Sequence, residues 1–197
     1  MKKLQITMLL VLCACLLAGC KKGNPSLKAD DIKTNTLLVR NNGTVQSCFV
    51  EDFDKDYYSE DELNQFIQSA ISEYAKTAGE KAVVMNSFKV NDKKAKATFT
   101  YTSIENYATF NNVEADVLSV EEAVSDERVP DTFVSAKRSD SVDKEKALSK
   151  KEYNVVIVNE PLDVIVDGTV VYYSNGLLLD DETVQSSSEG STIIVYK

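Results

Sequence analysis

The residues best suited to bind a metal ion form an acidic run directly after a predicted strand. Asp52, Asp54 and Asp56 alternate along this run, at the spacing of the first oxygen ligands of an EF-hand calcium loop. The match then ends, because Tyr57 replaces the glycine of that loop and Leu63 replaces its bidentate glutamate. The alternative, which we favour, is a solvated loop whose carboxylates stabilise the positive end of the next helix. Asp52, Asp54 and Asp56 therefore stay as candidate metal ligands only.

Few residues of this chain are suited to catalysis. None of its 197 residues is histidine, which removes the usual general base and a common metal ligand. The chain also lacks a glycine-rich phosphate loop and the G-x-S-x-G and S-x-x-K motifs of serine nucleophiles. Two of the 31 acidic residues could form a glycosidase pair, but that chemistry depends on a carboxylate separation that the sequence does not give. We assign no catalytic residue and no cofactor, and we expect that the protein is not an enzyme.

Cys48 is expected to be a buried structural residue. The other three cysteines lie within the first 20 residues, so Cys48 has no partner for an internal disulfide in the rest of the chain. It lies in a predicted strand, where a lone cysteine packs as a small apolar side chain. A reactive thiolate would need an activating neighbour such as histidine.

The aromatic residues, nine tyrosines and seven phenylalanines, could form a stacking face for a sugar. However, Tyr57–Tyr58 and Tyr172–Tyr173 are adjacent pairs, and neighbouring residues of a strand point to opposite sides of a sheet. The absence of tryptophan also argues against carbohydrate binding. We therefore expect these rings to pack in the core.

An export signal is the clearest feature of the sequence. Lys2 and Lys3 form a basic start, and an apolar run of twelve residues follows from Ile6 to Leu17. As a helix this run would be about 18 Å long, whereas crossing a bilayer core takes about 20 residues. Residues 1–19 are therefore predicted to be a signal peptide and not a membrane-spanning anchor.

The signal ends in Leu17, Ala18, Gly19 and Cys20, which resembles the lipobox of bacterial lipoproteins. The resemblance implies cleavage between Gly19 and Cys20 and a diacylglyceryl group on the sulfur of Cys20. The alternative is an ordinary secretory signal with a chance cysteine beside the cut. We predict that Cys20 is the lipidation site, that its lipid attaches the protein to the cell membrane, and that the body lies on the extracytoplasmic face.

The net charge argues against a nucleic-acid partner. The chain has 22 basic and 31 acidic residues, a net charge of −9, and loss of Lys2 and Lys3 with the signal leaves −11. Phosphate backbones repel a chain of this charge, so we expect no nucleic-acid binding. A protein or small-molecule partner stays unassigned.

One long helix among strands is predicted for the first half of the body. Residues 37–40 and 44–50 have the pattern of a hairpin, and residues 82–90 and 95–102 alternate as a second one. Between them, residues 59–79 are expected to form a helix capped by Ser59, with an apolar stripe that covers the sheet. This stripe consists of Leu63, Phe66, Ile67, Ala70, Ile71, Tyr74, Ala75 and Ala78.

Strands dominate the predicted second half. Residues 155–158 are apolar on both faces and indicate a central strand. Asp167-Gly168 and Asn175-Gly176 are typical of tight turns between hairpin strands. Residues 137–151 are strongly charged and are expected to be an exposed helix or a loop.

The predicted fold class is therefore α+β. It consists of an antiparallel sheet formed by a ββαββ unit with one long amphipathic helix, followed by a C-terminal β-meander. We expect five segments, the last of which could belong to the same domain as the third. They are a signal peptide at 1–19, a flexible tether at 20–35, an α+β unit at 36–112, an irregular connection with short elements at 113–151 and a β-rich unit at 152–197.

Parts of the body resemble a group of small lipoproteins of anaerobic Gram-positive bacteria whose activity is uncharacterised. The similar parts are residues 35–53, the helix that contains Glu62 and Leu63, and residues 155–176. The resemblance implies location and shape but no activity. We expect a lipid-anchored, extracytoplasmic protein with a non-enzymatic surface-binding or envelope-structural role. The alternatives are a ligand- or metal-capturing lipoprotein that uses the acidic loop 51–62, and a small envelope hydrolase.

Overall fold

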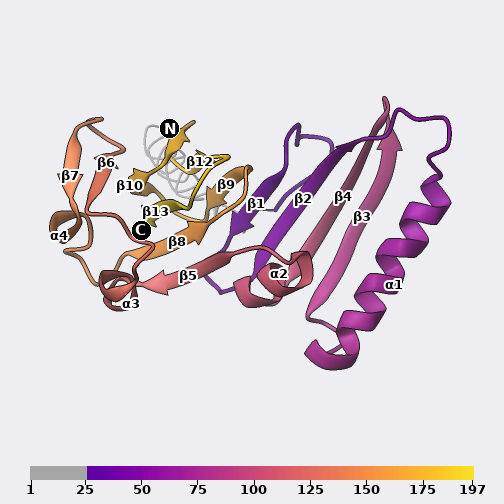
Figure 1. Ribbon diagram of the computed structural model, residues 1–197, viewed down its shortest axis with the longest axis horizontal. Helices are drawn as coiled ribbons and strands as arrows, with labels where there is room; N and C mark the ends of the chain where they lie inside the picture. Colours follow the sequence, from indigo (N-terminus) through magenta and orange to yellow (C-terminus); the bar gives the residue numbers. More distant parts are fainter. Residues whose placement is uncertain (1–25) are drawn as a thin grey trace, which may run out of the picture.

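The computed structural model describes residues 26–197, which Figure 1 shows as a ribbon. The predicted signal peptide, its cleavage site and Cys20 lie outside the described residues. In the part of the chain that is described, no helix is long and apolar enough to span a membrane.

Two β-sheets form the body. Sheet A has seven strands in the order β11-β12-β9-β1-β2-β4-β3, and sheet B has six in the order β5-β8-β13-β10-β6-β7, counted over residues 26–197. The strands of sheet A are β1 (Thr36–Val39), β2 (Val45–Asp52), β3 (Val83–Asn91), β4 (Lys94–Tyr101), β9 (Asp163–Val166), β11 (Gly176–Leu178) and β12 (Thr183–Ser186). Those of sheet B are β5 (Ala115–Ser119), β6 (Thr132–Ser135), β7 (Ser141–Asp143), β8 (Asn154–Val158), β10 (Val170–Ser174) and β13 (Thr192–Tyr196).

Four helices accompany the sheets in the described residues. The long helix α1 (Glu60–Ala78) runs along β3 at one end of the molecule, and the short helix α4 (Lys144–Ala147) lies at the other end (Figure 1). The helices α2 (Ile104–Asn111) and α3 (Val120–Ser125) flank β5.

The prediction of an α+β fold built on a ββαββ unit is wrong. Thirteen strands in two sheets dominate residues 26–197, so the fold is mainly β. Strands β1, β2, β4 and β3 are neighbours, but β1 also pairs in parallel with β9, and sheet A continues from there into β12 and β11. The first half of the body therefore shares its sheet with strands from the end of the chain.

The predicted C-terminal meander is wrong as well. Strands β9 and β10 flank Gly168 but lie in different sheets, and the same holds for β10 and β11 around Asn175. Gly168 serves close packing, because a Cβ atom there would lie 2.4 Å from the carbonyl oxygen of Lys197. The turn residues are thus crossing points between the sheets and not hairpin turns.

Predictions that rest on local signals are confirmed. Gly43 has a φ of 83° in the turn between β1 and β2. The Ser59 hydroxyl accepts a hydrogen bond from the backbone N–H of Glu62 at the start of α1, and Gly79 follows its end. Strand β8 lies between β5 and β13 in sheet B and is almost fully buried.

Residues 137–151 are more ordered than predicted. They contain β7 and α4, and Val142, Ala147 and Leu148 are buried. These side chains form part of a second core on one face of sheet B, together with Phe133 and Ile193. The main core lies between the two sheets and includes Val39 and Val164 of sheet A and Val156 and Ile194 of sheet B.

Residues 26–35, here called the N-terminal strap, lie across the face of sheet A opposite α1. Gln46 accepts a hydrogen bond from the Leu27 backbone N–H at 3.0 Å, and the Lys96 ammonium donates to the carbonyl oxygens of Ala29 and Ile32. Gln46 and Lys96 alternate with the residues that face α1, which places the N-terminal strap on the other side. This part of the predicted tether is therefore packed against the body.

Cys48 lies in the row of side chains under the N-terminal strap and is fully buried, as predicted. Burial raises the pKa of its thiol, which keeps the thiolate fraction low at neutral pH. We predict that deletion of residues 26–33 increases the rate of Cys48 modification by a disulfide reagent at pH 8 by about tenfold or more, because the deletion uncovers the thiol.

The measurement uses a Cys20→Ser background, so that Cys48 is the one reactive cysteine after the signal, with circular dichroism to check that the shortened chain is folded. Equal modification rates in the folded shortened and full-length chains would show that the N-terminal strap does not protect Cys48.

Candidate functional site

A groove with a cavity of about 400 Å³ lies between α1 and sheet A. Twelve residues line it, and ten of them are apolar. Those from α1 are Leu63, Phe66, Ile67 and Ala70; those from the sheet are Phe49, Phe88, Ala95, Ala97 and Phe99; Phe110 comes from α2. We call this space the α1 groove.

Small side chains on both walls explain why the α1 groove is not filled. Ala95 and Ala97 present only methyl groups from β4, and Ala70 does the same from α1. Protein interiors are normally packed to crystal-like density, so a hollow of this size is not expected between a helix and its sheet. The hollow makes the groove a candidate binding site, since ligand cavities typically start at about 300 Å³.

The apolar stripe of α1 covers the sheet less completely than predicted. None of the residues of α1 is buried, and Phe66 is 71% exposed. The C-terminal half of the helix is held by Tyr74, whose hydroxyl donates to the Asn106 side-chain oxygen at 2.9 Å and whose ring contacts Phe110 edge-on. The N-terminal half, from Leu63 to Ala70, spans the groove.

Five of the seven phenylalanines of the chain line the α1 groove. Phe49 and Phe99 meet edge-to-face with ring centroids 5.9 Å apart, and Phe110 lies 6.4 Å from Phe99. Phe88 pairs across the strands with Ala97, which places it on the same face. The groove therefore combines a small-residue floor with aromatic walls.

The two polar residues of the lining both come from its ends. Glu51 follows Phe49 on the same face of β2 and lies opposite Ala95, and its carboxylate is exposed. Asn111 lies at the end of α2, where its side-chain N–H group donates to the backbone oxygen of Tyr107 at 2.8 Å and to the Tyr101 hydroxyl at 3.2 Å. Glu51 is the one ionisable side chain in the lining.

Asn111 connects the α1 groove to a buried group of hydrogen-bonded side chains between the sheets. The Tyr101 hydroxyl lies 3.2 Å from the Ser47 hydroxyl, and the Tyr107 hydroxyl donates to the carboxylate of Glu160. Burial raises the pKa of Tyr101 to about 12 and raises the pKa of Tyr107 further, because Glu160 adds negative charge beside it. Burial also raises the pKa of Glu160, although the hydrogen bond from Tyr107 opposes this shift.

The candidate metal ligands do not converge. Asp52 pairs with Lys94 at 2.6 Å, which lowers the pKa of this carboxyl, and Asp54 pairs with Lys55 at 3.0 Å. Asp56 is exposed. In residues 26–197 no three carboxylate, thiol or imidazole groups lie together in a way that could hold a metal ion.

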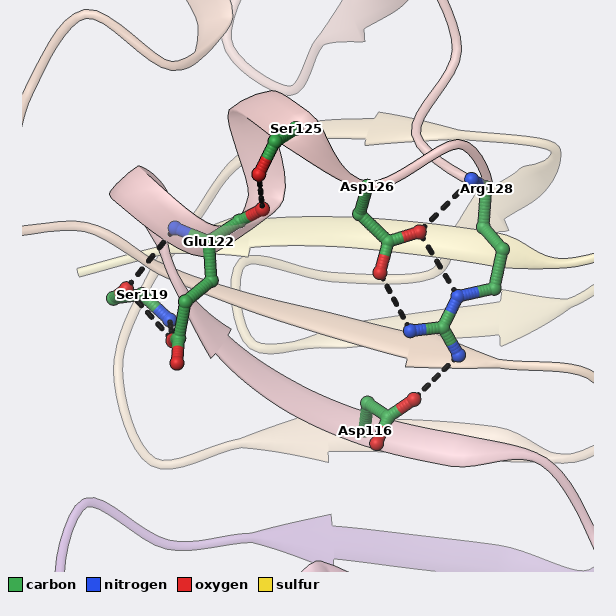
Figure 2. A network of polar contacts seen from close by, with 6 residues as sticks. All are labelled: Asp116, Ser119, Glu122, Ser125, Asp126 and Arg128. Atoms are coloured by element: carbon green, nitrogen blue, oxygen red, sulfur yellow. Dashed lines mark hydrogen bonds and ion pairs between the residues drawn. The ribbon is translucent and has the colours of Figure 1, made fainter.

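A second polar cluster, around Arg128, has a structural arrangement (Figure 2). Arg128 forms ion pairs with Asp126 and with Asp116 of β5, and its hydrogen bond lowers the pKa of Asp126 to about 2. Ser119 and Glu122 form a capping box at the start of α3 beside it. Because Arg128 pairs with both Asp126 and Asp116, it ties the turn after α3 to β5.

The expected core packing of the tyrosines is confirmed for one pair and not for the other. Tyr172 and Tyr173 are partly buried and pack against the two different cores, on opposite sides of β10. Tyr57 is 78% exposed, and its ring contacts Tyr58 in the loop before α1.

Sequence reasoning missed the α1 groove, although its parts were visible. The apolar stripe of α1 and the alternation of residues 95–102 were both predicted. However, the stripe was expected to cover the sheet. The feature that could have revealed the groove is the small size of the facing side chains, since Ala95 and Ala97 are too small to meet Ala70. Comparisons of the chain with protein-family models, with curated proteins and with solved structures found no match.

The raised pKa of Glu160 predicts that the stability of the folded protein depends on pH. Its pKa in the folded protein is raised above the ordinary value of 4.5, so folding favours the protonated form. This contribution is complete below about pH 4.5 and is lost as the pH rises through the raised value. We therefore expect wild type to lose stability relative to Glu160→Gln as the pH rises above about 4.5, measured by urea unfolding.

Tyr107→Phe provides the matched variant for this experiment. It removes the hydrogen bond that lowers the pKa of Glu160, so in this variant the loss should extend to higher pH. A stability difference between wild type and Glu160→Gln that is constant with pH would contradict the prediction.

Proposed function

We propose that this protein is a lipid-anchored lipoprotein of the extracytoplasmic face of a bacterial cell membrane, and that it binds a small apolar molecule in the α1 groove. Its role is binding and not catalysis. The observation that carries the binding role is the unfilled, Phe-lined cavity of about 400 Å³ under a helix with no buried residue.

Support for the anchor comes from the sequence. A basic start, a short apolar run and the residues from Leu17 to Cys20 resemble a lipoprotein signal. Lipidation of Cys20 would keep the α1 groove close to the membrane, where apolar and amphiphilic molecules are concentrated.

The size of the cavity supports a small molecule as the occupant. About 400 Å³ lies in the range of sites that enclose small ligands, and the lining is mostly apolar with polar groups at the ends, as in such sites. The alternatives have less support. The acidic loop pairs two of its three candidate ligands with lysines, and the groove contains one carboxylate where a glycosidase needs two.

Filling the groove tests the binding role. We predict that Ala70→Trp weakens binding of the neutral fluorescent probe N-phenyl-1-naphthylamine by about tenfold or more, because the indole occupies the space between α1 and β4. Binding is measured as the increase of probe fluorescence on titration with the chain of residues 20–197 carrying Cys20→Ser.

Ala78→Trp is the matched control. It adds the same side chain to α1 at an exposed position outside the groove, so it should leave probe binding within about twofold of wild type. Absence of probe binding by wild type, or equal binding by the two variants, would refute the role of the α1 groove.

The anchor makes a separate prediction. In a bacterial host that processes lipoproteins, intact mass spectrometry should show a chain that begins at Cys20 and carries a diacylglyceryl group. Cys20→Ser should lose this mass and no longer partition into the detergent phase with the membrane lipids. A wild-type chain that keeps its initiator methionine, or a variant that partitions like wild type, would exclude lipidation.

A further inference from the structure

We propose that the ligand of the α1 groove is an organic cation, an apolar body that carries an ammonium group. This inference rests on the proposed binding function and specifies the chemical class of its ligand. It is drawn from the charge, hydrogen-bonding groups and ring content of the lining.

The lining is complementary to positive charge. Its one ionisable side chain is the carboxylate of Glu51, and neither lysine nor arginine contributes to it. An apolar acid would be repelled by Glu51, whereas an ammonium group is attracted to it by the modest amount typical of an ion pair at an exposed carboxylate. Charge therefore distinguishes cations from other molecules of the same shape.

The hydrogen-bonding groups point to the same class. The carboxylate of Glu51 can only accept hydrogen bonds, and Asn111 uses its N–H group inside the protein, which leaves its carbonyl oxygen as an acceptor. The lining thus offers the acceptor of Glu51, and the N–H group of Asn111 is already used inside the protein. A ligand with donors, or with a positive charge, fits this arrangement better than one with acceptors.

The phenylalanine rings add a third attraction. The faces of aromatic rings carry partial negative charge and attract cations within about 6 Å of the ring centre, which is the principle of aromatic cages for ammonium groups. Five rings line this one groove, and Phe66, on the wall opposite the sheet, is largely exposed. Aliphatic residues would give an equally apolar site without this preference.

The experiment compares three ligands with the same octyl chain. Octyltrimethylammonium, octanol and octanoate compete with N-phenyl-1-naphthylamine for the chain of residues 20–197 carrying Cys20→Ser, at concentrations below micelle formation. We expect the cation to displace the probe at about tenfold lower concentration than octanol, and octanoate to be the weakest, because ring faces and a carboxylate together contribute about one order of magnitude.

Two variants locate the preference. Glu51→Gln should raise the concentration of the cation that displaces the probe about twofold to fivefold and leave that of octanol within twofold of wild type. Phe66→Leu, which keeps an apolar side chain, should weaken binding of the cation about threefold. Glu73→Gln is the control, since it removes the same charge from an exposed residue of α1 outside the lining.

The outcomes separate this inference from the proposed function. The cation preference is overturned, and the binding groove stands, if the probe binds but octanol displaces it as well as the cation does. The same conclusion follows if Glu51→Gln and Glu73→Gln weaken binding of the cation equally. If wild type binds neither probe nor ligand, both proposals fail.

Discussion

The pairing of β1 on both of its edges is the constraint on which the rest of the structure depends. This short strand bonds to β2 on one side and to β9 on the other, and Leu37, Leu38 and Val39 are at most 1% exposed. Satisfying the backbone of such a buried strand requires partners on both edges. The pairing with β9 therefore draws the C-terminal strands into sheet A, and the main core forms where that sheet meets sheet B. It also leaves α1 at the end of the sheet, beside β3, where its apolar residues pack only partly buried against the core.

The α1 groove is a consequence of this position. Deep in the core, Val156 and Ile194 are fully buried, as close packing demands. At the far end of sheet A, Ala95 and Ala97 leave space under α1, and Ile67, Ile71 and Tyr74 of the helix are only partly buried against the core. A cavity in the core would cost stability in proportion to its volume, whereas a hollow at the margin, open to solvent, carries a smaller penalty. The fold can thus keep the α1 groove without weakening the contact between its sheets.

The elements set by local chemistry were predictable from the sequence, and those set by distant contacts were not. Ser59 and Gly79 mark the ends of α1 through interactions within a few residues, and Gly43 marks the first hairpin in the same way. By contrast, the pairing of Thr36 with Asp163 depends on strands far apart in the chain, and nothing near Gly168 distinguishes a hairpin turn from a crossing between sheets. For the site, the sequence indicates the apolar stripe of α1 and the small residues Ala95 and Ala97. The space between them depends on how closely α1 approaches β4, which the sequence does not indicate.

None of the residues of α1 is buried, so this helix forms one wall of the α1 groove while the fully buried residues lie elsewhere in the chain. Leu63, Phe66 and Ala70 line the groove without belonging to either core, whereas Ile67, Ile71 and Tyr74 of the same helix pack against the main core. The architecture therefore lets the side chains on this wall of the α1 groove vary while both sheets keep their packing.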